Sequence, residues 1–373
     1  MANTFVTPTM VARDASIVLN NLLVVGNIVG RDKEAQFTGS KIGDSLKVTV
    51  PPVFGDANEF GGSTNATDVT ESEIDLTLEK HFYQRIDLTT KQRSLELHDF
   101  TRLVTIPAMR SISQSVDKYM LAHLRVFAAQ LAGTVTSRPA DIGHLAAANK
   151  ALNDALIPAS GRQMLVDTTV ESSLLQQNAF ISQDYGSDGP TGLRNATLGT
   201  RYGFTFVVDA LAGAHDRGDV AGSVLVDGTT AAGNDTITLK DFTNATGTVK
   251  AGTVFTIAGD DTRYVIRKNV EKASNGGVFR IYPALQSQAA GDAAITFEAA
   301  GFQNIAFHPN AVTAAIVAPE PLSTNSSRQA INGIGVRVSM SSSTISLADS
   351  IVYDVFTGFR VIQPNGGCLV GGA

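Results

Sequence analysis

The sequence predicts an α+β protein in which one long helix and a separate domain of short strands are set into a chain of mostly extended segments. Residues 107–132 repeat apolar side chains with a helical period, and little else in the chain is helical on this scale. Residues 221–298 contain short apolar runs separated by Gly, Asn and Asp. The chain has 373 residues, more than the roughly 250–300 that usually share one core, so we expect two or more sub-domains.

The long helix is expected to cover residues 107–132, a length of about 39 Å. Pro107 suits its first turn, because proline lacks the N–H that would be unsatisfied there, and Gly133 suits its end. One apolar stripe at spacings of three and four comprises Ile112, Val116, Met120, Leu124, Phe127 and Leu131. Much of the remaining circumference is filled by Arg110, Gln114, Asp117, Lys118 and Arg125. The stripe is therefore expected to be buried.

Two kinds of segment precede this helix. Residues 8–29 follow Pro8 with apolar side chains and predict an N-terminal helical arm. Residues 45–54 and 74–79 alternate apolar and polar side chains as strands do, and residues 55–72 between them are rich in Gly, Asn, Thr and Asp. We expect a long two-stranded arm with a mobile tip. An isolated hairpin is marginal in water, so such an arm is suited to lie along a neighbouring subunit.

Shorter elements follow the long helix. Residues 145–156 predict a helix, residues 162–167 a buried strand, and Thr168 or Thr169 could cap a further helix that runs to Gln177. A Gly-rich loop over 184–204 then leads into another strand. After residue 298 the chain resumes with a strand, a turn and a buried apolar run, and alternating strands fill the C-terminal part.

The segment 221–298 has a character of its own. Its predicted strands are 223–226, 236–239, 253–257, 263–266, 278–282 and 294–297. Gly, Asn and Asp turns separate them, and none of them has a helical period. Short strands at this density predict a small β-barrel or sandwich, and we interpret it as an insertion because the earlier pattern returns after it.

Composition excludes several classes of function. The net charge of −6 argues against a protein that holds nucleic acid through a broad basic face. A single cysteine, Cys368, excludes an intrachain disulfide. The N-terminus has no basic stretch followed by an apolar core, so we expect no signal peptide, and no apolar run approaches the roughly 20 residues that cross a bilayer.

Catalytic motifs are weak throughout. The six histidines are scattered without metal-ligand spacing, so we expect no metal site and no cofactor. Ser115 and Lys118 have the S-x-x-K spacing of penicillin-binding enzymes, but the companion motifs are missing. Asp260 and Asp261, close to Arg263 and Lys268, could bind a cation; the interpretation we favour is a charged, solvated hairpin that contacts a partner. We therefore expect no catalytic residues.

Three stretches carry a resemblance to a known family. They are residues 74–120, from IDLTLEK to SVDKYM; residues 193–210, LRNATLGTRYGFTFVVDA; and residues 304–322, NIAFHPNAVTAAIVAPEPL. Together with the order of elements, they resemble the major capsid proteins of tailed bacteriophages, in the branch whose coat subunit carries an inserted β-barrel domain. The match lies in patterns of polarity and turns over nearly the whole chain.

The resemblance implies a tailed-phage capsid fold with defined parts. These would be an N-terminal arm (1–44), an extended β-hairpin loop (45–98), the spine helix of a peripheral domain (99–140), an axial domain (141–220), the inserted β-barrel (221–298) and C-terminal strands that return to the peripheral and axial domains (299–373). Candidate intersubunit contacts are Glu59 and Phe60 in the hairpin loop, and Asp260, Asp261, Arg263 and Lys268 in the insertion.

The implied function is that of a coat subunit and not of an enzyme. Copies of the chain would form hexamers and pentamers of an icosahedral shell around double-stranded DNA, assembled in the host bacterial cytoplasm with a scaffolding protein and a portal ring. The DNA would be enclosed without sequence-specific binding, and no membrane would take part. Two alternatives remain open: another structural virion protein of the tail or decoration type, and a hydrolase whose site is assembled from remote residues.

Overall fold

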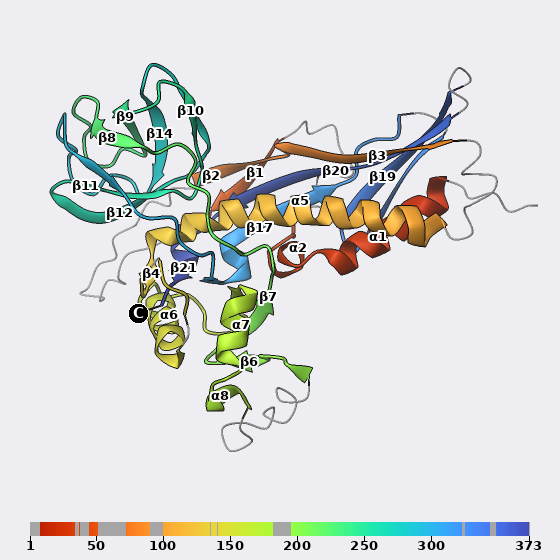
Figure 1. The fold of residues 1–373 in the computed structure, drawn as a ribbon, viewed down its shortest axis with the longest axis horizontal. Coiled ribbons are helices and arrows are strands. Elements are labelled where there is room, and N and C mark those ends of the chain that lie inside the picture. Colours follow the sequence, from red (N-terminus) through yellow and green to blue (C-terminus); the bar gives the residue numbers. More distant parts are fainter. Residues whose placement is uncertain are drawn as a thin grey trace, which may run out of the picture. The chain divides into compact units, whose positions relative to one another are not determined.

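A computed structural model describes residues 8–33, 37, 45–50, 72–89, 100–134, 136–139, 141–181, 195–322, 325–343 and 348–372. The chain divides into two compact units, and their boundary falls within helix α5 (Ile106–Leu124), drawn in orange in Figure 1. One unit comprises Met1–Asn21, Arg31–Ile112 and Val312–Gln363. The other comprises Leu22–Gly30, Ser113–Ala311 and Pro364–Ala373.

The first unit is built on a five-stranded antiparallel sheet. Its strands are β3 (Lys80–Thr89), β17 (Val312–Val317), β18 (Ser326–Ile331), β19 (Ile334–Ser343) and β20 (Ala348–Val361). The central strand is β20, which pairs with β3 along one side and with β19 and β17 along the other. Buried side chains alternate along β20, with Ile351, Tyr353 and Val355 inside, as the sequence pattern predicts.

Two helical elements and a hairpin complete this unit. Helix α1 (Pro8–Leu22) donates from Ser16 Oγ to the carbonyl of Gln329 in β18, and a π-helical turn (η1, Thr101–Thr105) leads into α5. Strands β1 (Ser45–Val50) and β2 (Ser72–Thr77) pair antiparallel, and Val48 lies opposite Ile74. The predicted two-stranded arm is thus present at its base, whereas the tip expected over 55–72 lies almost entirely outside the described residues.

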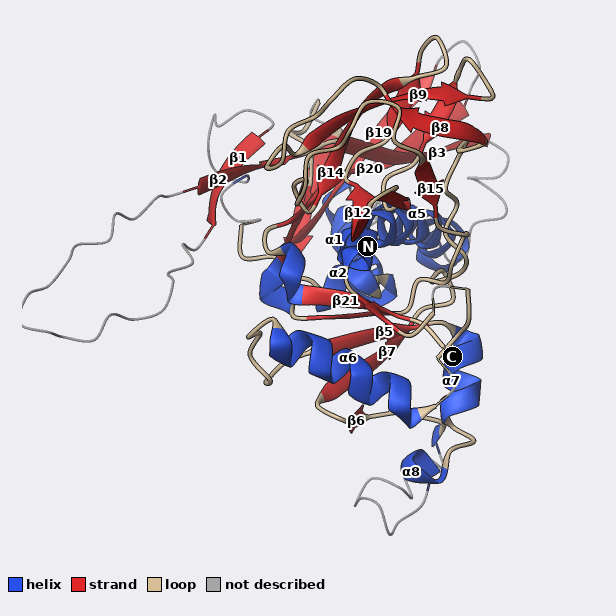
Figure 2. Ribbon diagram, turned by 90° about the vertical axis from the view of Figure 1, so that its left-hand side faces the viewer, coloured by secondary structure: helices blue, strands red, loops and turns tan. Residues whose placement is uncertain are grey.

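The second unit contains a six-stranded mixed sheet in the order β4-β21-β16-β5-β7-β6. Its strands are β4 (Leu131–Ala132), β5 (Gln163–Val166), β6 (Thr200–Arg201), β7 (Phe204–Val208), β16 (Ile305–Phe307) and β21 (Gly367–Val370). Its helical elements are α2 (Val25–Ile28), η2 (Arg125–Ala129), α6 (Ile142–Asp154), α7 (Thr168–Leu174), α8 (Asn178–Ile181), η4 (Pro309–Ala311) and η5 (Pro364–Gly366). Helix α6 covers one face of this sheet (Figure 2), where its Leu145, Ala148 and Leu152 share a core with Met164 and Cys368.

A second sheet of the same unit holds the six strands predicted between 223 and 297. They are β8 (Gly222–Val226), β9 (Thr236–Phe242), β11 (Val254–Ile257), β12 (Asp260–Ile266), β14 (Gly277–Tyr282) and β15 (Ile295–Phe297), in the order β15-β11-β12-β14-β9-β8. A bridge between Leu225 and Ala294 joins the two ends of the sheet, so it curls back on itself. A further two-stranded pair, β10 (Gly247–Val249) with β13 (Val270–Lys272), was not predicted from the sequence.

The long helix is shorter than expected and has a different end. Regular α-helix stops at Leu124, a 3₁₀ turn runs over Arg125–Ala129, and residues 131–132 belong to strand β4, so the prediction of helix to residue 132 is wrong. The predicted stripe is buried from Ile112 to Phe127. Two of the polar residues placed around the stripe, Asp117 and Arg125, are also buried.

Candidate functional site

The first candidate residues lie where strand β12 begins. Gly259 adopts a φ of +87°, and Asp260 follows it. Asp260 accepts hydrogen bonds from the Tyr264 hydroxyl (2.7 Å), the Ser287 hydroxyl (2.8 Å) and the Thr262 amide (2.9 Å). Burial alone would raise the pKa of Asp260, but the bonds from Thr262 and Tyr264 outweigh it and hold the pKa at about 2. Hydrogen-bond donors therefore surround this carboxylate, which argues against the cation site kept as an alternative.

Arg263 also has its partner inside the domain. Its Nε and Nη2 donate to the two carboxylate oxygens of Glu298 at 2.7 and 2.6 Å, a bidentate pair in which both side chains are at most a quarter exposed. The expectation that Asp260 and Arg263 are exposed turn charges is therefore wrong. Each of them is held by neighbours in the same domain.

The other two charges of this group are exposed. Asp261 follows the partly buried Asp260 in β12, and Lys268 lies in the turn after β12. They remain the candidates for contact with another molecule. Glu59 and Phe60, the candidate contacts in the hairpin loop, lie outside the described residues.

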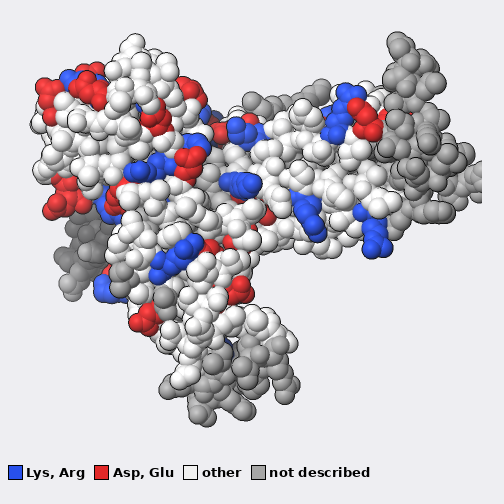
Figure 3. All heavy atoms as spheres, viewed as in Figure 1, with Lys and Arg blue, Asp and Glu red and all other residues white. Residues whose placement is uncertain are grey.

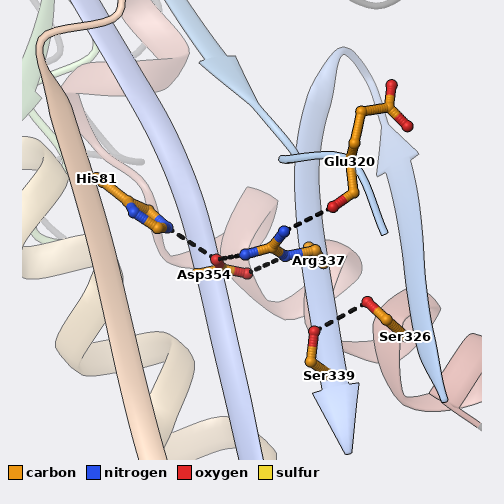
Figure 4. Close-up of polar contacts among 6 residues, drawn as sticks. All are labelled: His81, Glu320, Ser326, Arg337, Ser339 and Asp354. Atoms are coloured by element: carbon orange, nitrogen blue, oxygen red, sulfur yellow. Dashed lines mark hydrogen bonds and ion pairs between the residues drawn. The ribbon is translucent and has the colours of Figure 1, made fainter. Parts of the chain in front are cut away.

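A polar group centred on Asp354 in the first unit was not predicted from the sequence (Figure 4). Asp354 in β20 is buried, and Arg337 of β19 donates to both of its oxygens, with Nε to Oδ1 at 2.9 Å. His81 of β3 places Nε2 2.8 Å from Asp354 Oδ2, and Arg337 also donates to the carbonyl of Glu320. The Asp354 carboxylate in β20 thus links its strand to both neighbouring strands, β3 and β19. The sequence does contain an indication of this group. Asp354 is the only charged residue between Ile351 and Phe359, and a charge within such an apolar strand needs a buried partner.

The described residues offer little for metal or membrane chemistry. Within those ranges, His, Cys, Asp and Glu side chains form no group of three that could hold a metal ion. Among the helices of the same ranges, none is both long enough and apolar enough to cross a lipid bilayer. Acidic and basic side chains lie next to each other over strands β8–β15 on the face shown in Figure 3.

Comparison with solved structures shows which fold this is. Over 94% of this chain and 88% of the other, the fold is similar to a chain in the capsid structure of the Cyanophage P-SCSP1u, with a TM-score of 0.52 and 10% sequence identity. It is similar to a chain of Mycobacterium phage Che8 over 93% of this chain and 90% of that one, with a TM-score of 0.53 and 16% identity. The chain has a phage capsid fold. The sequence matches no protein-family model and no curated protein sequence.

A phage capsid fold is the fold that the resemblance in the three stretches of sequence implied. At identities of 10% and 16%, few individual residues are shared, so the likeness lies in the order and arrangement of the elements. The mixed helix and strand content expected from the sequence is part of that likeness. The phage capsid fold by itself names no contact residue, so contacts between copies have to be argued from exposure and charge.

Proposed function

We propose that this chain is the major capsid protein of a tailed phage, a coat subunit whose copies assemble into an icosahedral shell around double-stranded DNA. The observation that carries the proposal is the extent of the match. More than nine-tenths of the chain follows the fold of a chain from a phage capsid structure, so little of it is left over for an unrelated activity. A capsid subunit acts through its surfaces, which agrees with the weak catalytic motifs of the sequence.

The elements fit the parts of such a subunit. We assign α5 to the spine helix, β1 and β2 to the base of the extended hairpin loop, and α6 with its sheet to the axial domain. Strands β8–β15 correspond to the inserted barrel. Their core supports this assignment, because its fifteen buried members all lie between Val224 and Ile295. A segment that packs its own core is suited to be an insertion.

The expected partners follow from this role. Copies of the chain would form the hexamers and pentamers of the shell, with a scaffolding protein and a portal ring to guide assembly in the host cytoplasm. The net charge of −6 supports a wall that encloses DNA without binding it tightly, because a strongly basic wall would hold the phosphate backbone. The protein would then be found in the capsid of the mature virion.

Electron microscopy and sedimentation of the purified protein, expressed alone and with its scaffolding protein, test the proposal. We expect closed shells of uniform diameter in at least one of the two preparations. Tubes or flat rings in both would favour a tail protein. A soluble monomer that turns over ester or peptide substrates would favour the hydrolase.

A further inference from the structure

An amine without access to water lies in the β10–β13 pair. Lys272 is the last residue of β13, and its side chain is 0% exposed. Its Nζ lies 4.6 Å from the centroid of the Phe242 ring and 2.9 Å from Asp219 Oδ2. The approach to Asp219 has the distance of an ion pair but not the angles of a hydrogen bond, so this nitrogen has no hydrogen-bond acceptor among the described residues.

The same oxygen of Asp219 contacts a second nitrogen. Asn244, in the loop between β9 and β10, donates from its side-chain Nδ2 to Asp219 Oδ2 at 2.9 Å. One carboxylate oxygen therefore touches both a lysine amine and an asparagine carboxamide. The two nitrogens can be no farther apart than twice this contact distance.

The backbone around the three side chains is shaped for this contact. Gly247 lies directly opposite Lys272 in the β10–β13 register and has a φ of +131°. A Cβ at Gly247 would lie 2.6 Å from Asp219 Oδ2, so only glycine leaves room for the carboxylate. The loop with Asn244 is fixed at both ends, by a bond from the Thr243 amide to the Ala221 carbonyl (2.8 Å) and one from the Asn275 amide to the Ala245 carbonyl (3.2 Å).

We propose that Lys272 and Asn244 form an intrachain isopeptide bond, with Asp219 as the group that carries the proton between them. Lys272 Nζ gives a proton to Asp219 and attacks Asn244 Cγ. A new C–N bond forms between Nζ and Cγ, and the bond between Cγ and Nδ2 breaks. Asp219 passes this proton, and then a second proton from Nζ, to the departing Nδ2, which leaves as an ammonium ion. One ammonium group and one primary amide thus become one secondary amide and one ammonium ion, and no oxidant, metal or cofactor is consumed.

The charge of Asp219 sets the starting state of the reaction. Its contact with Lys272, followed by the hydrogen bond from Asn244, lowers its pKa below the ordinary value, so Asp219 starts as a carboxylate and takes up the proton only as Nζ attacks Cγ. The nucleophile must be a neutral amine, and the transfer from Nζ to the adjacent carboxylate produces one. The reaction is a single self-modification without turnover, and it is independent of the proposed capsid role.

Mass spectrometry of the full-length chain decides the question. We expect an intact mass that is lower than the sequence mass by one ammonia molecule, and a tryptic digest with a branched peptide that joins the segments containing Asn244 and Lys272. Trypsin should fail to cleave after Lys272. Two ordinary linear peptides in the wild type would overturn the proposal. Ammonia loss without the branched peptide would also overturn it, because that result indicates a succinimide at an asparagine.

Variants separate the roles of the three residues. Lys272→Arg and Asp219→Asn should each have the full sequence mass and lack the branched peptide. Lys240→Arg is the matched control, since Lys240 pairs with Asp292 at 2.7 Å in the same domain, and it should retain the branched peptide. A branched peptide that persists in Asp219→Asn would refute the role of Asp219. If either variant fails to fold, the wild-type digest still decides whether the bond exists.

Discussion

The carboxylate of Asp117 accepts the backbone N–H of Gly26 at 3.1 Å, although 91 positions separate the two residues in the chain. Its other oxygen accepts the N–H of Val24 at 3.0 Å. Asp117 is 3% exposed, so it serves as an internal acceptor that fixes the backbone where helix α2 begins. This role makes the carboxylate sensitive to pH.

Stability should depend on pH through Asp117. Burial raises its pKa from 3.8 to about 6, against the opposing effect of the bonds from Val24 and Gly26. The folded state therefore binds this proton more tightly than the unfolded chain, and the contribution of Asp117 to the free energy of unfolding falls as pH rises through that interval. The fall should be on the order of 2–3 kcal/mol. Urea unfolding at several pH values measures it.

The contribution of Asp117 has to be measured as a stability difference between wild type and a variant, because His215 changes stability with pH in the opposite direction. Burial lowers the pKa of His215 from 6.5 to about 3, so its contribution to stability increases with pH over an overlapping interval. Asp117→Asn retains His215, and the stability difference between wild type and this variant should change with pH. Asp235→Asn, the same substitution at an exposed position, is the matched control. A stability difference for Asp117→Asn that does not change with pH would mean that Asp117 does not titrate in this interval.

A glycine pair tests the packing of the buried Arg125. Arg125 Nε donates to the Gly252 carbonyl at 3.1 Å, and a Cβ at Gly252 would lie 2.7 Å from the Cβ of Arg125. Gly259 has nearly the same φ, +87° against +83°, but open space around it. In both alanine variants the free energy of unfolding should fall by about 1–2 kcal/mol, because alanine is strained in the left-handed backbone conformation. In Gly252→Ala it should fall by a further ~1–3 kcal/mol, because the new methyl group overpacks against Arg125, and urea unfolding measures both values. Equal losses would show that Arg125 moves aside without cost.

Removing one partner of the ion pair between Arg337 and Asp354 should destabilise the protein more than removing both. Their side chains are 10% and 2% exposed, so Arg337→Met leaves a buried carboxylate with only His81 beside it and should cost about 3–5 kcal/mol of unfolding free energy. The double variant Arg337→Met with Asp354→Leu should be more stable than the single one, because no charge is left buried. Lys150→Met, which breaks a pair that is 76% and 62% exposed, should cost less than ~1 kcal/mol. A double variant no more stable than Arg337→Met would contradict this explanation.

Periodicity predicted those elements that bury one continuous face. The stripe of α5 and the alternation along β20 were found because every second, third or fourth side chain packs into a core. The end of α5 was not found, because residues after Leu124 keep the helical period while the backbone tightens into a 3₁₀ turn and then pairs as β4 with β21. That pairing joins segments more than two hundred residues apart, and no local pattern encodes it.

The polar residues were harder to predict for a related reason. Asp117, Arg125 and Arg263 have ordinary surface positions in the local pattern, yet each is held by groups distant in the sequence: Gly26, Gly252 and Glu298. Whether a charged side chain is solvated depends on which distant segment covers it. The sequence therefore predicted the charged group around β12 as a set, but not which of its members face outward.

The exposed charges Asp261 and Lys268 should matter for assembly and not for folding. Neither lies in the core, so Asp261→Asn with Lys268→Gln should change the free energy of unfolding by no more than about 0.5 kcal/mol. If they meet charges on a neighbouring subunit, this variant should form fewer shells, and the remaining assembly should depend less on salt than that of the wild type. Asp235→Asn with Arg280→Gln removes one acid and one base from exposed positions of the same domain, so it is the matched control and should assemble normally. Arg263→Gln should instead lower stability, because it leaves the Glu298 carboxylate without its bidentate partner.

Light scattering during assembly and urea unfolding of the subunits measure the two effects separately. Wild-type assembly by the Asp261 and Lys268 variant would remove this turn from the intersubunit contacts.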